Sequence, residues 1–359
     1  MKVLHFLALG GAGGIESLCV DIARSSYDDN FFYFLWGGGK NAEQIAKITS
    51  NIEIRNFKNK NFFSEYKSFE NYCIENHIES IVVQGISPMM LIFAILIKKR
   101  YPKLKIVQYI HTDAKCVIHD YKRKILLKIV YHYCDGCIAI SKYVKESVKE
   151  ALGDNSKVHI IYNGVDIHKF SGTHTDSIDR AKVHLIYVGR LIQEKGVDNL
   201  LKALAIGNVM NYDLTIIGDG PYREQLENFS NKLKLDKSVK FVGTQWDIPL
   251  WLNKADLFVH PCNCNEGFGI TLIEAMASGV PCVAFAKGAI PEVIDDGING
   301  FLVQDCTIED LADKLKEVCM LILNDGKRWL KIQNAARKKA ESFSIKYYVE
   351  NLSTYLHKL

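Results

Sequence analysis

Short apolar runs alternate with longer helix-like stretches along almost the whole chain, and this alternation restricts the fold more than any other feature. Strands that alternate with helices are typical of parallel, doubly wound sheets, whose ligands bind beyond the carboxyl ends of the strands. The expected strands are Val3–Leu9, Phe31–Trp36, Ile52–Ile54, Ile81–Val83, Ile106–Tyr109, Cys137–Ile140 and Val158–Ile161, followed by runs that begin at His184, Leu214, Val239, Leu257, Cys282 and Phe301.

The length of 359 residues suits two domains, and 48% hydrophobic with 24% charged residues is ordinary for a soluble globular protein. The alternation pauses in a polar stretch without periodicity from Ser171 to Asp179, which we expect to be a linker. The sequence therefore predicts two α/β domains.

The distribution of charge is more informative than the net charge of +4, which is too small to indicate a nucleic-acid partner. Ten basic residues fall between Lys98 and Lys128, opposed only by Asp113 and Asp120. Within this segment Lys122, Arg123, Lys124 and Lys128 are interspersed with apolar residues. Such a basic amphipathic helix can rest on an anionic membrane surface, although a solvated face over a buried stripe is the alternative.

No apolar run reaches the ~20 residues that span a bilayer. The longest, Met89 to Ile97, stops at three basic residues and is expected to be a buried helix.

Ten cysteines without an even framework, and no secretory signal, favour reduced thiols in a cytoplasmic protein. The pair Cys134 and Cys137 is expected to be structural. Cys262 and Cys264 are expected to lack a third and a fourth metal ligand.

The stretch from Glu266 to Pro281 carries the candidate site. Glu266 and Glu274 stand eight positions apart, glycines flank Phe268, a short apolar strand precedes the stretch, and Gly279 with Pro281 ends it. A helix that begins at a glycine-bearing turn offers free N–H groups to an anion. Two carboxylates beside a phosphate cradle suit a sugar nucleotide, because they accept hydrogen bonds from hydroxyl groups. The alternative is a strand-turn-helix with two surface glutamates.

Two other places are candidates for binding. The strand at Val3 runs into Gly10–Gly14 and then an amphipathic stretch, as in nucleotide-binding domains, but without a strict G-x-G-x-x-G pattern; the alternative is a tight packing turn. His111 follows a strand at its carboxyl end, where a functional and a structural role are both open. Ser141 follows the next strand and is expected to cap a helix.

The string from Glu266 to Pro281 resembles the E-x7-E signature of retaining glycosyltransferases of the GT-B fold, specifically family 4, also called glycosyltransferase group 1. The segments Asn163–Asp166, Val188–Gly196 and Leu214–Pro221 match the same family pattern. The resemblance covers nearly the whole chain and is strongest from Val188 to Val303.

The resemblance implies two Rossmann-like doubly wound domains that face each other across a cleft. Residues 1–170 would form the acceptor-binding domain, and residues 171–341 the sugar-nucleotide-binding domain. Residues 342–359 would form a C-terminal helix that crosses back to the N-terminal domain, with Ile345 to Leu359 as the candidate.

The resemblance also implies roles for individual residues. Arg190 and Lys195 would neutralise the diphosphate as it leaves, Glu274 would accept hydrogen bonds from the ribose, and Glu266 would hold the transferred sugar. The implied catalytic residues are His111 and Glu266, and the implied donor-binding residues are Gly13, Gly14, Arg190, Lys195, Phe268, Gly269, Ile270 and Glu274. No Asp-x-Asp pair appears where a metal-dependent transferase would need one, so neither a metal nor a cofactor is expected.

The predicted function is transfer of a hexosyl group, with retention of configuration, from a nucleotide-diphosphate sugar to a saccharide or lipid-linked saccharide acceptor. We expect surface-polysaccharide biosynthesis, a UDP-sugar rather than a GDP-sugar, no nucleic-acid partner, and a cytoplasmic protein that is peripheral on the inner face of the plasma membrane through residues 98–128. One alternative is a Rossmann-type oxidoreductase, which leaves the glutamate pair unexplained. Another is a non-catalytic, membrane-associated nucleotide-sugar-binding module, which leaves Arg190 and Lys195 unexplained.

Overall fold

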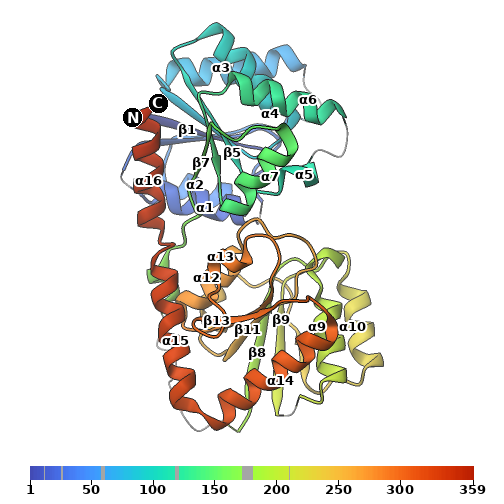
Figure 1. Cartoon of the computed structure of the whole chain (residues 1–359). Coiled ribbons are helices and arrows are strands. Elements are labelled where there is room, and N and C mark those ends of the chain that lie inside the picture. The colour runs from blue at the N-terminus through green and yellow to red at the C-terminus, as the bar shows by residue number, and fades with distance from the viewer. Residues whose placement is uncertain (12, 26, 58–60, 118–120, 172–180, 210) are drawn as a thin grey trace. The chain divides into compact units, whose positions relative to one another are not determined.

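The computed structural model divides into two compact units, Met1–Val165 with Ile345–Leu359, and Asp166–Ser344. It describes residues 1–11, 13–25, 27–57, 61–117, 121–171, 181–209 and 211–359 (Figure 1). The expected linker from Ser171 to Asp179 lies, from residue 172 onward, outside the described residues. Each unit is described below by itself.

The first unit contains a parallel sheet of seven strands in the order β3-β2-β1-β4-β5-β6-β7. Most of its strand residues are buried, because helices cover both faces of a doubly wound sheet, and such strands appear in sequence as continuous apolar runs. The strands are β1 (Lys2–Leu7), β2 (Asp29–Phe34), β3 (Ile52–Ile54), β4 (Ser80–Gln84), β5 (Lys105–Ile110), β6 (Gly136–Ala139) and β7 (Val158–Ile160).

Aromatic rings form much of the core of the first unit: Phe6 stacks on Phe69 with ring centroids 4.5 Å apart, and Phe93 lies beside both. Ser141 caps α7 as predicted, with its hydroxyl accepting from the Val144 N–H at 3.1 Å. The helices are α1 (Gly14–Ala23), α2 (Lys40–Ile48), α3 (Phe62–Glu75), α4 (Pro88–Arg100), α5 (Ala114–Val117), α6 (Tyr121–Tyr133), α7 (Lys142–Leu152) and α16 (Ile345–Lys358).

The prediction of a buried helix from Met89 to Ile97 is confirmed by α4, which buries Met90, Leu91, Phe93, Ala94 and Ile97. Among the described residues no helix is both long and apolar enough to cross a membrane.

The last helix, α16, completes the first unit although it comes from the far end of the chain. It buries Tyr348, Val349, Leu352 and Leu356, and the Ile345 N–H donates to the Val165 carbonyl at 2.9 Å. The ring of Tyr348 lies parallel to that of Tyr109 on β5, with centroids 6.3 Å apart. The prediction that the C-terminal helix returns to the N-terminal domain is thereby confirmed.

The second unit contains a parallel sheet of six strands in the order β10-β9-β8-β11-β12-β13. As in the first unit, the chain adds strands outward in one direction and then crosses back to add them in the other, so the fold prediction of two Rossmann-like sheets is confirmed. The strands are β8 (Val183–Val188), β9 (Tyr212–Ile217), β10 (Val239–Phe241), β11 (Leu257–His260), β12 (Cys282–Phe285) and β13 (Gly300–Val303).

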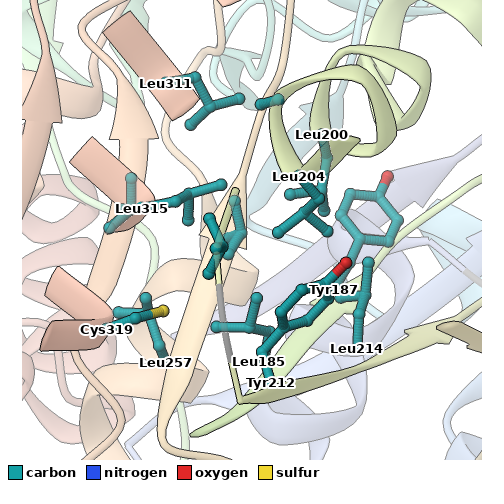
Figure 2. Packing of buried hydrophobic residues seen from close by; sticks show 14 of the residues in the cluster. Leu185, Tyr187, Leu200, Leu204, Tyr212, Leu214, Leu257, Leu311, Leu315 and Cys319 are labelled. Atoms are coloured by element: carbon teal, nitrogen blue, oxygen red, sulfur yellow. The ribbon is translucent and has the colours of Figure 1, made fainter. Parts of the chain in front are cut away.

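One hydrophobic cluster of the second unit lies between this sheet and helices α9 and α14. Figure 2 shows Leu200 and Leu204 of α9 together with Leu311 and Leu315 of α14, packed with strand residues such as Leu257. The helices are α8 (Ile167–Phe170), α9 (Val197–Ile206), α10 (Arg223–Lys232), α11 (Ile248–Leu252), α12 (Ile270–Ala277), α13 (Ile290–Val293), α14 (Ile308–Asn324) and α15 (Gly326–Glu341), and a 3-10 turn, η2, spans Gln193–Lys195.

Candidate functional site

The strand order of the second unit reverses between the neighbouring strands β8 and β11. Ligands of open α/β sheets bind at such a switch point, beyond the carboxyl ends of the strands. The loop after β8 carries Arg190 and Lys195, and the loop after β11 carries Glu266 and Phe268. The fold therefore brings these sequence-predicted residues to the place where the topology forms a ligand site.

Close backbone contacts hold these loops together. Gly196 has φ +67°, and a Cβ there would lie 2.0 Å from the Pro261 carbonyl oxygen, so the turn after β8 lies directly on the loop after β11. Gly288, in the loop after β12, has φ +62°, and a Cβ there would lie 2.2 Å from the Glu266 carbonyl oxygen. That same oxygen accepts a hydrogen bond from the Ala289 N–H at 2.8 Å.

An ion pair between Lys195 and Glu266 lies at the centre of the site. The two side chains are 19% and 20% exposed, and Lys195 Nζ lies 2.7 Å from Glu266 Oε2. Burial alone would raise the pKa of Glu266, but neighbouring His260 and Lys195 outweigh it and hold that pKa well below its ordinary value. Burial would likewise lower the pKa of Lys195, but Glu266 outweighs burial and raises it. Both groups are therefore charged at neutral pH.

Three further side chains gather around Glu266. His260 Nε2 lies 3.5 Å from Glu266 Oε2, Cys262 Sγ lies 3.4 Å from the same oxygen, and Cys264 Sγ lies 3.2 Å from Cys262 Sγ. The expectation that Cys262 and Cys264 lack a third and a fourth metal ligand is wrong for Cys262, because His260, Cys262 and Glu266 bring their ligand atoms within 4.8 Å of one another; Cys264 is not part of that group. The hydrogen bond between the thiols lowers the pKa of Cys264 to about 7 and raises that of Cys262.

The other predicted residues of the second unit lie near this ion pair in the chain. Gly269, with φ +86°, precedes α12, so Ile270 is the first residue of that helix. Phe268 is buried and its ring contacts that of Phe343 edge-on, with centroids 5.4 Å apart. Glu274 lies in the middle of α12 and is half-buried. The ring of Phe268 therefore packs inside the second unit and does not face solvent.

Arg190 is the exposed cation of the site. Its carbonyl oxygen accepts a hydrogen bond from the Tyr187 hydroxyl at 3.2 Å, which fixes the backbone at the end of β8. Within the part of the chain that the structure describes, the guanidinium makes no ion pair. It is therefore available to an anion, whereas the charge of Lys195 is already balanced by Glu266.

In the first unit, His111 directly follows β5 and is buried. Its Nε2 lies 2.8 Å from Gln84 Oε1; Gln84 Nε2 lies 3.1 Å from His5 Nδ1; and His5 Nε2 lies 3.1 Å from Asn30 Oδ1. With Gln84 in this orientation, both histidines carry the proton on Nε2, and His111 Nδ1 keeps an unshared electron pair. Nothing in the described residues hydrogen-bonds to that Nδ1.

Burial lowers the pKa of His111 to about 3 and that of His5 to about 4, so both rings are neutral at physiological pH. His111 can thus accept a hydrogen bond through Nδ1, but it is a weak base. Gln84 and His5 were not identified from the sequence. The available signal for Gln84 was a polar residue at the carboxyl end of β4, beside the β1–β4 switch point of the first sheet.

The predicted glycine loop of the first unit follows β1. Gly13 precedes α1 without a side-chain cap and Gly14 is the first residue of that helix, so the backbone N–H groups of its first turn are not bonded by a capping side chain. The turn reaches back to the loop after β2, where the Gly10 N–H donates to the Gly37 carbonyl at 3.2 Å.

Comparison with known proteins shows what this arrangement is similar to. The family model of glycosyl transferases group 1 matches residues 176–339, and that of glycosyltransferase family 4 matches residues 13–169. An uncharacterised glycosyltransferase of Methanocaldococcus jannaschii is 27% identical over 87% of this chain and 82% of its own length. A Klebsiella pneumoniae protein named for its place in the cps region is 26% identical over 77% of this chain and 85% of its own.

Among solved structures, Anabaena Alr3699/HepE in complex with UDP superposes with a TM-score of 0.87 at 22% identity, covering 100% of both chains. The two Rossmann-like units thus define a glycosyltransferase of the GT-B fold. Because the two family models together match nearly the whole sequence, the chain belongs to the group 1, family 4 glycosyltransferases.

The contact between Gly288 and Glu266 can be tested by substitution. Gly288→Ala should lower the free energy of unfolding by about 1–3 kcal/mol more than Gly297→Ala, since its Cβ must displace the Glu266 backbone. Gly297 is the matched control, because it also has a positive φ of +72° but has nothing within 4 Å of the added Cβ. Urea unfolding of both variants measures the difference, and equal losses would contradict the crowding argument.

Proposed function

We propose that the chain transfers a hexosyl group, with retention of configuration, from a nucleoside-diphosphate sugar to a saccharide or lipid-linked saccharide, and that its second unit binds the donor. The observation that carries this proposal is the Lys195–Glu266 pair at the β8–β11 switch point. Glu266 lies in the loop that leads into α12. A diphosphate and a sugar present phosphate oxygens and hydroxyl groups side by side. The site offers cations for the first and carboxylates for the second.

The chemistry follows from where charge develops during transfer. As the bond from the sugar to the diphosphate breaks, negative charge accumulates on the departing phosphate, and fixed cations and helix N–H groups stabilise it there. Arg190, Lys195 and the N–H groups at Gly269 and Ile270 take this role. Arg190 is already free of ion pairs among the described residues, whereas Lys195 must divide its interaction between Glu266 and the phosphate.

The carboxylates and the histidine orient the sugar nucleotide. Glu266 accepts hydrogen bonds from the transferred sugar, and Glu274 accepts them from the ribose. His111 is neutral, with Nδ1 as an acceptor, so it orients a hydroxyl group and does not remove a proton outright. Gly13 and Gly14 contribute N–H groups at the start of α1. None of these roles requires a metal ion, and we propose a metal-independent transferase.

The donor and the pathway are inferred from similar proteins. Alr3699/HepE was crystallised with UDP and with UDP-glucose, which supports a UDP-sugar donor. The Klebsiella relative from a cps region supports a role in surface-polysaccharide biosynthesis. We propose a cytoplasmic location, peripheral on the inner face of the plasma membrane.

A nucleotide panel tests the donor. UDP and UDP-hexoses should raise the melting temperature, because a ligand at about 100 times its dissociation constant adds about 2.7 kcal/mol to the free energy of unfolding. GDP-sugars and NADH should have smaller effects. In the absence of acceptor, the protein should also slowly hydrolyse the sugar nucleotide that stabilises it and release free hexose. EDTA should not change this rate. Stabilisation by NADH alone would instead favour an oxidoreductase, and a rate that needs Mg²⁺ or Mn²⁺ would contradict metal independence.

Lys195→Ala should lower turnover by on the order of 100-fold, comparable to the loss of one donor from an oxyanion hole. Lys202→Ala is the matched control, since Lys202 lies one helix further on, in α9, and pairs with Asp198 outside the site. Initial rates with saturating donor measure both variants. A folded Lys195→Ala protein with wild-type turnover would refute the assignment.

We further propose that α6 contacts an anionic membrane surface. Ile125, Ile129 and Tyr133 lie four residues apart, on one side of the helix, and are 41%, 40% and 38% exposed. Lys124 and Lys128 precede two of them along the helix, which gives the mixture of basic and apolar groups that interfacial helices present. The side chains of Lys122 and Arg123, also in the predicted set, lie outside the described residues.

Part of the basic segment is neutralised by carboxylates from elsewhere in the first unit. Lys98 pairs with Asp135 at 2.7 Å, Arg100 with Glu70 at 3.1 Å, and Lys115 with Glu150 at 2.6 Å. A count of charges within residues 98–128 therefore overstates the charge that a membrane would meet, and α6 becomes the main candidate for contact.

Vesicle flotation tests this surface. The protein should float with anionic liposomes at low salt and dissociate at high salt, because salt screens exposed charges. Changing Lys122, Arg123, Lys124 and Lys128 to Glu should abolish flotation. Changing the four exposed lysines 232, 234, 237 and 240 of the second unit to Glu is the matched control, and should leave flotation intact. Equal effects of the two quadruple variants would show that only overall charge matters.

A further inference from the structure

We propose that His260, Cys262 and Glu266 form a binding site for a thiophilic divalent cation of the Zn²⁺ class, and that the cation and the sugar-nucleotide donor exclude each other. The second part rests on the proposed function, because it requires Glu266 to hold the donor. The first part rests on the geometry of three side chains and is independent of the reaction.

The distances between the donor atoms suit tetrahedral coordination. Zinc binds sulfur at about 2.3 Å and nitrogen or oxygen at about 2.0–2.2 Å, so neighbouring ligand atoms in a tetrahedron lie roughly 3.4–3.8 Å apart. Glu266 Oε2 lies 3.5 Å from His260 Nε2 and 3.4 Å from Cys262 Sγ. Cys264, whose Sγ lies 3.2 Å from Cys262 Sγ, is not one of the three residues whose ligand atoms all lie within 4.8 Å of one another, so the site has three protein ligands.

His260 is the second observation that points to a ligand. It is 4% exposed; Nδ1 makes no hydrogen bond with any described residue, and Nε2 makes only the 3.5 Å contact with Glu266 Oε2. A buried polar group without a partner is unfavourable by about 1–3 kcal/mol, and native structures rarely keep one without a reason. Nε2 points toward the Glu266 carboxylate at a distance too long for a good hydrogen bond but suitable for two ligands of one metal ion.

The chemical nature of the ligands determines which cations would bind. A sulfur ligand and an imidazole beside a carboxylate favour Zn²⁺ and related ions, whereas Mg²⁺ and Ca²⁺ prefer sites made of oxygen. Magnesium that accompanies nucleotides should therefore not compete for this cluster. In metal-dependent transferases the cation assists the reaction, whereas at this site the cation opposes donor binding.

Lys195 links the cation to the donor. Its ammonium group contacts Glu266 Oε2 at 2.7 Å, so a metal ion bound to the same oxygen is repelled by Lys195 unless one of the two moves. A metal-bound Glu266 cannot accept the same hydrogen bonds from the sugar, and a displaced Lys195 cannot hold the diphosphate in the same position. By linkage, the donor must weaken metal binding by the factor by which the metal weakens donor binding.

Cobalt absorption tests the site without any reference to activity. Co²⁺ added to the full-length, reduced protein should give the sulfur-to-cobalt charge-transfer band of a thiolate-ligated ion. Cys262→Ser should weaken Co²⁺ binding by about 100-fold, since loss of even an outer partner of a metal ligand weakens binding 10–100-fold. Cys116→Ser, at an exposed cysteine outside the cluster, is the control and should bind Co²⁺ as the wild type does. A wild-type protein without the band, or a band that survives in Cys262→Ser, would overturn the site.

Zinc titration of the transferase tests the exclusion. Zn²⁺ should raise the KM for the donor in the wild type and in Cys116→Ser, but not in Cys262→Ser, with each protein compared with its own zinc-free KM. EDTA should restore the wild-type KM. A cobalt band together with an unchanged KM would overturn the exclusion alone, and a cobalt band in a protein that binds no nucleotide would leave the site standing while refuting the proposed function.

Discussion

The Glu266 carboxylate can lie in a largely buried loop only because Lys195 neutralises it, and this ion pair determines how the loops of the second unit are arranged. A buried charge whose partner is removed is destabilising by several kcal/mol, so the folded unit needs Lys195 and Glu266 in contact. They come from loops after β8 and β11, strands that are neighbours in the sheet but lie far apart in the sequence. The backbone contacts of Gly196 and Gly288 then hold the two loops at the distance that the pair requires.

The two units use the same topology to produce opposite kinds of site. The second unit gathers charge at its switch point, with a lysine, a glutamate and an exposed arginine. The first unit gathers neutral hydrogen-bonding groups, because burial keeps His111 and His5 uncharged and Gln84 fixes their protonation. Charged groups suit the strongly anionic part of a sugar nucleotide, and neutral acceptors suit hydroxyl groups. The division of chemistry between the units follows from which residues stand at the ends of otherwise similar strands.

The fold was accessible from the sequence because each buried strand is a compact apolar run, and the ends of β5 and β11 placed His111 and the Glu266 loop correctly. The helix cap at Ser141 was accessible for the same local reason. Contacts between distant segments were not. Nothing near Lys195 in the sequence indicates that it pairs with Glu266, and the spacing of Cys262 and Cys264 does not reveal that His260 turns toward the same carboxylate. Gln84 could not be found from the sequence because its role depends on contacts with His5 of β1 and His111 after β5.

The position of α16 has a consequence for how the chain is made. Its apolar side chains complete the first unit, yet residues 345–359 follow the whole of the second unit in the sequence. During synthesis the first unit therefore emerges from the ribosome without one of its helices. The second unit can fold before that helix emerges. Surface beside β5, where Tyr348 later covers Tyr109, stays exposed for that interval. Incomplete units of this kind are prone to association, so a nascent chain depends on rapid completion or on chaperones, and early termination before residue 345 would leave the first unit open.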